Sequence, residues 1–348
     1  MELSVKSTKY SDGTAIRWQI PADNRRRDLL HRYTPTPYGM DLLVMAKTVR
    51  LETNCLMLLE SALGFFARHQ GCPPGHPEFL WRIVSQEDHQ TDEAGVALAA
   101  FSDHGLRFAN IGRRSFLAVD LEKREGIGFV AERLIEGEPK LHCRSVFDTL
   151  FCMSAGSLGM VPLAAACVGI GEKGLLVFGP PNSGKTTASY LAAKLGFEFH
   201  ADQAVFSEIE GGKLRVWGDL LPAIFRPESL QFLPELQTST RRFSYPELTV
   251  HYLPKRPFQA SKAQPVSPIC SVFLNRGSSL TTQLRPIEPA ELSRRFTANI
   301  LFRDDDCFQQ QTSSVLGVLE GVPAYELSYG NNPAKAAELF PGLLRTLA

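Results

Sequence analysis

The spacing of apolar and polar positions predicts two parts of different character, the first of which spans residues 1–150. Within it, residues 51–68 (LETNCLMLLESALGFFAR) carry apolar side chains at helical spacing and predict a helix, with Thr53 or Asn54 as its cap. The turn-rich stretch 71–78 (GCPPGHPE) ends this pattern. Alternating segments then predict strands at 79–86, 96–101, 106–111 and 115–121. Because this part contains no chemical motif, we expect a small α+β domain for packing or recognition.

Residues 151–348 begin their regular pattern with a strand, a loop and a helix. The strand is LLVF at 175–178, the helix runs from about Thr186 to Leu195 before Gly196, and FEFHA at 197–201 is the next strand. The other predicted elements are a hairpin at 204–218, a long surface excursion at 234–268, strands at 269–276, 281–288 and 322–330, and helices from Pro289, near 313–320 and from Pro333. This order predicts an α/β domain on a mixed, strand-rich sheet, and an α+β chain overall.

Composition excludes some classes of function. Of 348 residues, 44% are apolar and 21% charged, which is ordinary for a globular protein with a core. Lys plus Arg and Asp plus Glu both number 37, so the net charge is zero. A protein that neutralises nucleic-acid phosphates needs a basic excess or stripe, so we expect no nucleic-acid partner. The arginine runs 25–27, 241–242 and 294–295 are interpreted as solvated faces.

Cysteine usage and hydropathy indicate a cytoplasmic protein. The seven cysteines are spread singly with no C-x-x-C pair, which favours reduced thiols over a disulfide framework or a zinc site. The first residues, MELSVKSTKYSDG, lack an apolar signal core. The most apolar stretch, 160–170, is too short to span a bilayer, so it is expected in a core and no membrane partner is expected.

The strongest motif is GPPNSGKTT at 179–187. Gly179, Gly184, Lys185 and Thr186 satisfy G-x-x-x-x-G-K-[ST], with an apolar strand before and a helix after. Amides at a helix start and the helix dipole favour bound phosphate. Lys185 is expected to reach the β- and γ-phosphates, and the Thr186 hydroxyl to ligate Mg²⁺.

Two prolines in the loop restrict where its donors lie. Pro180 and Pro181 have no N–H, so the donors come from Asn182 onward, and Asn tolerates the positive φ of a bend. The predicted phosphate-binding residues are therefore Gly179, Asn182, Ser183, Gly184, Lys185, Thr186 and Thr187. The sequence thus predicts a nucleotide as ligand, with ATP and Mg²⁺ as cofactors.

A carboxylate follows the next predicted strand. Asp202 ends FEFHA, at the sheet edge where the loop also lies. A carboxylate there could hold Mg²⁺ or accept a proton from an attacking hydroxyl. Asp202 is therefore the candidate catalytic base and metal ligand beside Lys185 and Thr186, the alternative being an Asp that caps a turn. His200 shares a face with Asp202, and a packing role is favoured for it.

Several other positions carry charged residues that could belong to a different kind of site. A AAA-type motor needs a downstream strand ending in Asp-Glu, but the Asp-Glu pair is Asp92–Glu93, upstream of the loop. The run 304–306 (DDD) is interpreted as a solvated loop, and Asp219 as a turn residue or a further metal carboxylate. Three arginines near predicted element ends could meet a γ-phosphate, and the sequence does not choose between them: Arg226, Arg276 and Arg303.

Residues 163–345 resemble the HPr serine kinase/phosphorylase family, whose nucleotide-binding core is of the phosphoenolpyruvate-carboxykinase type. The resemblance lies in GLLVFGPPNSGKTTASYLAAKLGFEFHADQAVF, in the hairpin IEGGKLRVWG, in PAIFRPESL, in VFLNRG and in VPAYELSYG. It implies a phosphate-loop core on a mixed sheet and transfer of phosphate from Mg·ATP to a hydroxyl. By the resemblance, Asp202 matches the first of the family's two adjacent Asp residues, whereas Gln203 replaces the second.

The hypothesis from the sequence is an ATP- and Mg²⁺-dependent kinase that acts on a protein serine or a small molecule. Two alternatives stay open. One is a nucleotide sensor or scaffold without transfer activity, motivated by Gln203 and the long upstream part. The other is a shikimate-type small-molecule kinase, whose helix, glycine and Asp pattern resembles LAAKLGFEFHAD. The acceptor is not identified, and the sequence leaves open whether the chain forms a homo-oligomer.

Overall fold

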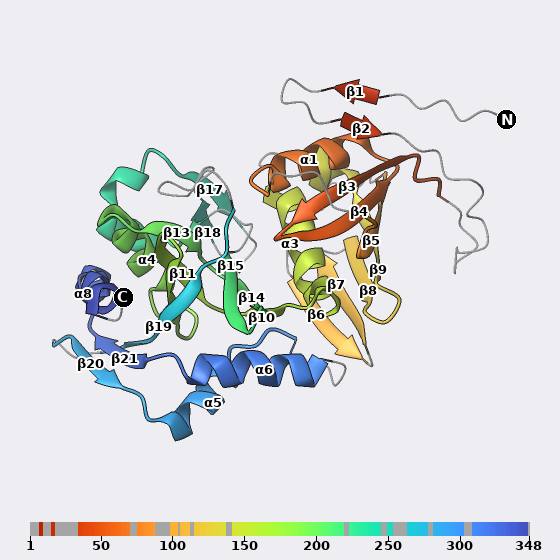
Figure 1. Ribbon diagram of the computed structural model, residues 1–348. Coiled ribbons are helices and arrows are strands. Elements are labelled where there is room, and N and C mark those ends of the chain that lie inside the picture. Colours follow the sequence, from red (N-terminus) through yellow and green to blue (C-terminus); the bar gives the residue numbers. More distant parts are fainter. Residues whose placement is uncertain are drawn as a thin grey trace. The chain divides into compact units, whose positions relative to one another are not determined.

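The computed structural model describes residues 7–9, 15–17, 34–69, 75–87, 98–103, 105–111, 115–136, 141–218, 223–244, 249–252, 263–277, 281–302 and 308–346. The chain divides into two compact units, here called the N-terminal unit (Met1–Leu158) and the C-terminal unit (Gly159–Ala348). Both appear in Figure 1. Helix α3 (Leu141–Ser154) runs through residue 150 and belongs to the N-terminal unit.

The N-terminal unit is built on a seven-stranded mixed sheet of order β3-β4-β5-β9-β8-β7-β6. The inner strands β4, β5 and β9 run parallel, and the remaining pairs are antiparallel. The strands are β3 (Tyr38–Val44), β4 (Lys47–Thr53), β5 (Phe79–Gln86), β6 (Leu98–Asp103), β7 (Leu106–Ile111), β8 (Ser115–Asp120) and β9 (Glu125–Ala131), and a separate pair is formed by β1 (Ser7–Lys9) and β2 (Ala15–Arg17).

Helices cover one face of this sheet. They are α1 (Leu56–Phe66), α2 (Glu132–Glu136), α3 and the 3₁₀ turn η2 (Ala155–Leu158). Trp81 of β5 is fully buried between Phe66 of α1 and Phe151 of α3, with ring centroids 6.2 and 6.4 Å away. On the other face, Phe116 and Phe129 stack across β8 and β9, and Phe116 is exposed.

The start of the first helix was predicted wrongly. Residues 51–53 belong to β4, where Val49, Leu51 and Thr53 alternate as buried positions of a strand. The helix begins at Leu56, and its N-cap is Cys55. The Thr53 hydroxyl instead accepts a hydrogen bond from the Cys55 amide at 3.1 Å, which turns the chain between strand and helix. Apolar residues of a buried strand and of a helix merge in one sequence run, so periodicity alone misplaced the boundary.

The C-terminal unit contains a six-stranded mixed sheet of order β13-β11-β12-β19-β21-β20. Strands β12, β19 and β21 are parallel neighbours, while β11 and β20 pair antiparallel with them. The strands are β11 (Ala166–Ile170), β12 (Lys173–Phe178), β13 (Glu198–Ala201), β19 (Ser267–Arg276), β20 (Gln283–Pro286) and β21 (Ala324–Tyr329). Both units are thus mixed α/β, which confirms an α+β chain.

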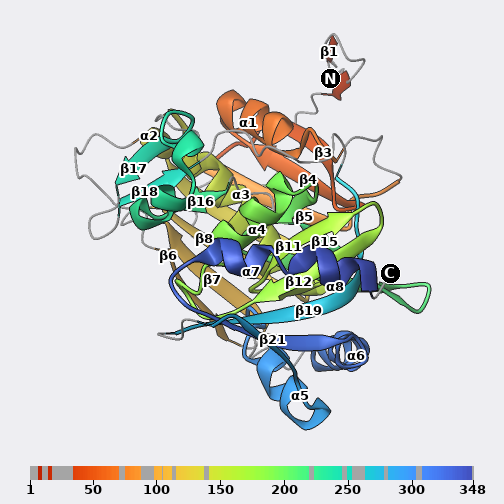
Figure 2. The same cartoon turned by 90° about the vertical axis from the view of Figure 1, so that its left-hand side faces the viewer.

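Both faces of this sheet are covered. Helices α4 (Lys185–Lys194), α7 (Pro333–Ala337) and α8 (Phe340–Thr346) pack on one face, and Figure 2 shows α7 and α8 crossing β12 and β19. On the other face lie α5 (Pro289–Thr297), α6 (Gln309–Glu320) and the hairpin β14 (Val205–Glu210) and β15 (Lys213–Gly218), joined by β10 (Val161–Leu163). The predicted hairpin is confirmed, and the predicted closing helix is two short helices.

A three-stranded sheet begins just before the predicted surface excursion and extends into it. The excursion was expected at 234–268, but its described residues include regular structure. The elements are β16 (Ile224–Phe225), β17 (Arg241–Ser244), β18 (Thr249–Tyr252), η3 (Pro227–Phe232) and η4 (Pro234–Leu236), with strand order β16-β18-β17. Leu230, Leu233 and Leu236 pack into the core with α4, so this segment forms part of the fold.

No helix in the described part of the chain combines the length and the apolar character that crossing a membrane requires.

Candidate functional site

The loop between β12 and α4 is a tight turn with three left-handed residues. Gly179, Asn182 and Gly184 have φ of 149°, 66° and 87°. The Ser183 amide donates to the Pro180 carbonyl at 3.1 Å, and the helix follows with the Ala188 amide on the Gly184 carbonyl at 2.9 Å. A helix leaves the amides of its first turn without intrahelical acceptors, so the turn delivers free donors at the end of β12.

Gly179 allows the loop to fold against the sheet. A Cβ at this position would lie 2.5 Å from Ser183 Oγ and 3.0 Å from the Leu274 carbonyl of β19, so only glycine fits. Ser183 is 3% exposed, and its Oγ has no hydrogen-bond partner among the described residues. The loop therefore contains a buried polar side chain, the Ser183 hydroxyl, in addition to its backbone amides.

The Lys185 ammonium lies over the loop. Nζ donates to the carbonyls of Gly179 at 2.7 Å and Pro180 at 3.2 Å. Burial lowers the pKa of Lys185, and the charge of Asp202 opposes this shift. The ammonium and the carboxylate are therefore close enough to interact electrostatically.

Asp202 follows β13 directly and is 1% exposed. Its Oδ2 accepts a hydrogen bond from the Ile224 amide of β16 at 3.0 Å, which orients the carboxylate. His200 Nε2 lies 3.5 Å from Glu198 Oε2 on the same strand. Gln203, next in the chain, is exposed.

The two threonines of the motif differ in burial. Thr187 is 4% exposed and lies inside the first turn of α4, whereas Thr186 is partly exposed. A magnesium ion that keeps several waters and phosphate oxygens needs only one or two protein oxygens. Thr186 and Asp202 remain the predicted protein oxygens for such an ion. No group of three or more His, Cys, Asp or Glu side chains suited to a metal occurs among the described residues.

Sequence reasoning missed Tyr329. This residue ends β21, is 1% exposed, and its phenol donates to the Ser183 carbonyl. Burial raises the pKa of Tyr329 to about 12, and the charge of Arg276 opposes the shift. The signal available in the sequence was VPAYELSYG, a predicted strand whose last aromatic residue falls at the sheet edge that carries the loop.

The arginine candidates separate in the structure. Arg276 ends β19 in register with Tyr329, and its charge acts on that phenol beside the loop. Arg226 follows β16 and is exposed. Further candidates lie outside the described residues: Arg303, Asp219, the run 304–306, the pair Asp92–Glu93 and the arginine run 25–27.

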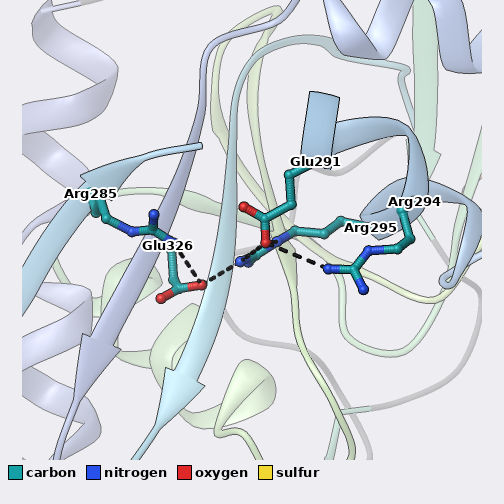
Figure 3. A network of polar contacts seen from close by, with 5 residues as sticks. All are labelled: Arg285, Glu291, Arg294, Arg295 and Glu326. Carbon is teal, nitrogen blue, oxygen red and sulfur yellow. Dashed lines mark hydrogen bonds and ion pairs between the residues drawn. The ribbon is translucent and has the colours of Figure 1, made fainter. Parts of the chain in front are cut away.

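A charge network occupies the sheet face opposite α4 (Figure 3). Glu326 of β21 accepts from Arg295 of α5 at 2.5 Å, and Arg295 also bonds Glu291 at 2.7 Å. The hydrogen bond from Arg295 lowers the pKa of Glu326. The Arg295 guanidinium also stacks over the Phe273 ring at 5.5 Å. Because arginines pair with its carboxylates, this network is interpreted as a set of ion pairs that links α5 to β21 and not as a ligand site.

Comparison with known proteins gives a distant structural likeness. No protein-family model matches the sequence, and no match to a curated protein is found. The chain has a weak structural resemblance to the solved structure of the Hpr(Ser) kinase/phosphatase from Coxiella burnetii, with a TM-score of 0.28 and 13% identity, covering 53% of this chain and 88% of that chain. A likeness at this level carries no argument about chemistry, so function is argued from this chain's own residues.

Proposed function

We propose that the C-terminal unit binds Mg·ATP at residues 179–187 and transfers its γ-phosphoryl group to a hydroxyl. The observation that carries the proposal is the burial of Asp202 within electrostatic reach of Lys185, at the edge where the loop presents its helix amides. A buried carboxylate near a half-buried ammonium costs desolvation free energy, and such costs concentrate at functional sites.

Each residue has a role that follows from its position. The amides from Asn182 onward and the dipole of α4 stabilise phosphate charge. Lys185, which in the structure bonds the Gly179 and Pro180 carbonyls, would turn to the β- and γ-phosphates. Thr186 and Asp202 would hold Mg²⁺, whose charge offsets the charge that develops on the leaving oxygen.

The transfer step uses the Asp202 carboxylate as a base. The acceptor hydroxyl oxygen forms a bond to the γ-phosphorus while the bond from that phosphorus to the β–γ bridging oxygen breaks. The hydroxyl proton passes to Asp202, and ADP leaves. The hydrogen bond from the Ile224 amide orients the carboxylate for this role. The acceptor stays unassigned, as a protein serine or a small molecule.

The test compares wild type with Asp202→Asn, Lys185→Met and Glu210→Gln. Glu210 is a matched control, because it is a carboxylate 70% exposed at the tip of the β14–β15 hairpin. ATP affinity and ATP turnover are measured with and without Mg²⁺, and with added small alcohols. We expect Asp202→Asn to reduce turnover by about 10²- to 10⁴-fold with ATP still bound. Lys185→Met should reduce binding, and Glu210→Gln should change neither.

A nucleotide sensor without transfer activity is the second candidate. It is favoured by Gln203, an exposed amide where the resemblance noted above places a second carboxylate. A sensor predicts ATP binding with no turnover in wild type and no effect of Asp202→Asn on either. Turnover raised by a small alcohol would instead support a small-molecule kinase, and no ATP binding by wild type would overturn both proposals.

A further inference from the structure

The contact between Tyr329 and Ser183 joins two elements that are distant in sequence. The residues are 146 positions apart, and the phenol reaches the loop from the last residue of β21. Strand β19 lies between β21 and β12, and the Gly277 amide donates to the Tyr329 carbonyl at 2.9 Å. The position of the phenol is therefore set by the sheet and not by the loop.

The contact constrains one peptide group of the loop. A trans peptide is planar and its C=O and N–H point in opposite directions. Since the Ser183 carbonyl points to Tyr329, the Gly184 N–H points away from it. This amide belongs to the first-turn donors of α4, which have no intrahelical acceptor.

Gly184 makes this peptide easy to turn. Glycine populates positive and negative φ about equally, so the peptide between residues 183 and 184 has little intrinsic preference for one orientation. The space is also fitted to the phenol, because a Cβ on Gly184 would lie 2.3 Å from the Tyr329 oxygen. Because Gly184 has no side chain, the Tyr329 oxygen fits beside it. Because glycine has little preference of its own, the peptide depends on Tyr329 to keep one orientation.

The phenol is suited to a constant donor role. Burial raises the pKa of Tyr329 to about 12, so the group stays protonated over the physiological range. Its ring packs in the core cluster that also contains Ala188, Tyr190 and Leu327. Asn332 then caps α7 by accepting from the Ala334 amide at 3.0 Å, so the chain after Tyr329 is ordered as well.

We infer that Tyr329 is a positioning residue, which bonds the Ser183 carbonyl and so holds the Gly184 amide toward the bound phosphate. The inference rests on the proposed function for the identity of the ligand, and the orientation of the peptide is testable without it. Without the phenol, only a fraction of loops would present this amide, and apparent affinity falls in proportion to that fraction.

The test compares Tyr329→Phe with Tyr325→Phe in the full chain. Tyr325 lies on the same face of β21, partly buried against the same core, so its variant loses an equivalent phenol away from the loop. The probes are the Gly184 amide resonance of ligand-free protein labelled with [¹⁵N]glycine, and the affinity for Mg·ATP and for inorganic tripolyphosphate.

We expect Tyr329→Phe to shift or split the Gly184 resonance and to weaken both ligands by about 3- to 10-fold, in the range of one lost hydrogen bond. Tyr325→Phe should leave all three readouts at the wild-type values. A merely structural role would change the unfolding midpoint but neither affinity. An unchanged Gly184 resonance in Tyr329→Phe overturns the inference, whether or not ATP binds. Wild type that binds neither ligand would overturn the proposed function, and the resonance would still decide the role of Tyr329.

Discussion

The two units bury polar side chains in different ways. In the N-terminal unit these groups complete hydrogen bonds of the fold: Arg107 donates to the Met153 carbonyl of α3 at 2.7 Å, and the Trp81 indole donates to Ser154 at 3.0 Å. In the C-terminal unit, Lys185 and Asp202 gather at one sheet edge beside helix amides that lack intrahelical acceptors. Buried polar groups therefore complete the fold of the first unit, whereas in the second unit they gather where the proposed binding site lies.

The two sheets also differ in how other elements cover their faces, and this explains part of the difference in polar burial. The C-terminal sheet is covered on both faces, so its edge is where backbone donors and side chains can meet a ligand. The N-terminal sheet has its helices on the face of Trp81, and the buried polar groups described there tie those helices to the strands. Four predictions test whether the two kinds of burial differ in free energy.

The largest effect is expected from Arg107→Met. Arg107 is 2% exposed on β7, and removing it leaves the Met153 carbonyl without its donor at the end of α3. The loss should be about 3 kcal/mol of the unfolding free energy of the N-terminal unit, the upper end for a hydrogen bond to a charged group. Hydrogen exchange of peptides from β7 and α3 under denaturant reports this unit separately.

The control for Arg107 is Lys123→Met on the same sheet. Lys123 pairs with Asp120 at 2.6 Å, but its side chain is 74% exposed, so stability should not change measurably. A loss from Arg107→Met no larger than that of the control would mean that its burial contributes little to the fold.

The second-largest effect is expected on the pH dependence of the stability of the N-terminal unit. Burial, with the charge of Arg68, lowers the pKa of His69 from 6.5 to about 4, and its Nδ1 accepts from the Met45 amide at 3.0 Å. The folded pKa lies below the unfolded one, so the stabilisation is present above pH 6.5 and is lost as pH falls to 4. The difference in pKa corresponds to about 3 kcal/mol, which should disappear from the pH profile of His69→Gln.

Lys185 gives the corresponding test in the C-terminal unit. Burial lowers its pKa, so the charged form costs stability at neutral pH, and this cost is lost as pH rises toward the unfolded value of about 10.4. The stability of Lys185→Met relative to wild type should therefore fall as pH rises.

For His69, equal pH profiles of stability for wild type and His69→Gln below pH 6.5 would contradict the N-terminal half of the comparison.

The smallest effect compares two buried serines. Ser154 Oγ accepts from Trp81 and donates to the Leu150 carbonyl at 2.7 Å, so Ser154→Ala leaves an indole N–H unpaired and should cost about 1–3 kcal/mol. Ser183 Oγ has no partner among the described residues, so Ser183→Ala should be neutral or slightly stabilising. Hydrogen exchange measured on each unit gives the stability change of each serine variant. Equal losses of stability would show that the two kinds of polar burial do not differ.

Local patterns predicted the elements whose signals lie within one segment. The strands at 79–86 and 106–111 and the hairpin at 204–218 follow from alternation and turn residues. The loop at 179–184 follows from its glycines and from Asn182, which has a positive φ. By contrast, β3, β11 and α3 were not predicted, since short apolar runs do not distinguish a strand from a buried helix.

By itself, the sequence determined the turn between β12 and α4 and the type of residue at each of its positions, because backbone sterics and missing side chains act locally. Only the tertiary structure decided that Asp202 is buried beside Lys185, bonded to the Ile224 amide, and that Tyr329 reaches the Ser183 carbonyl. The Tyr329 contact depends on the pairing of β12, β19 and β21, and the position of Asp202 depends on the pairing of β13 with β11. Pairing between distant strands is not encoded in any single segment.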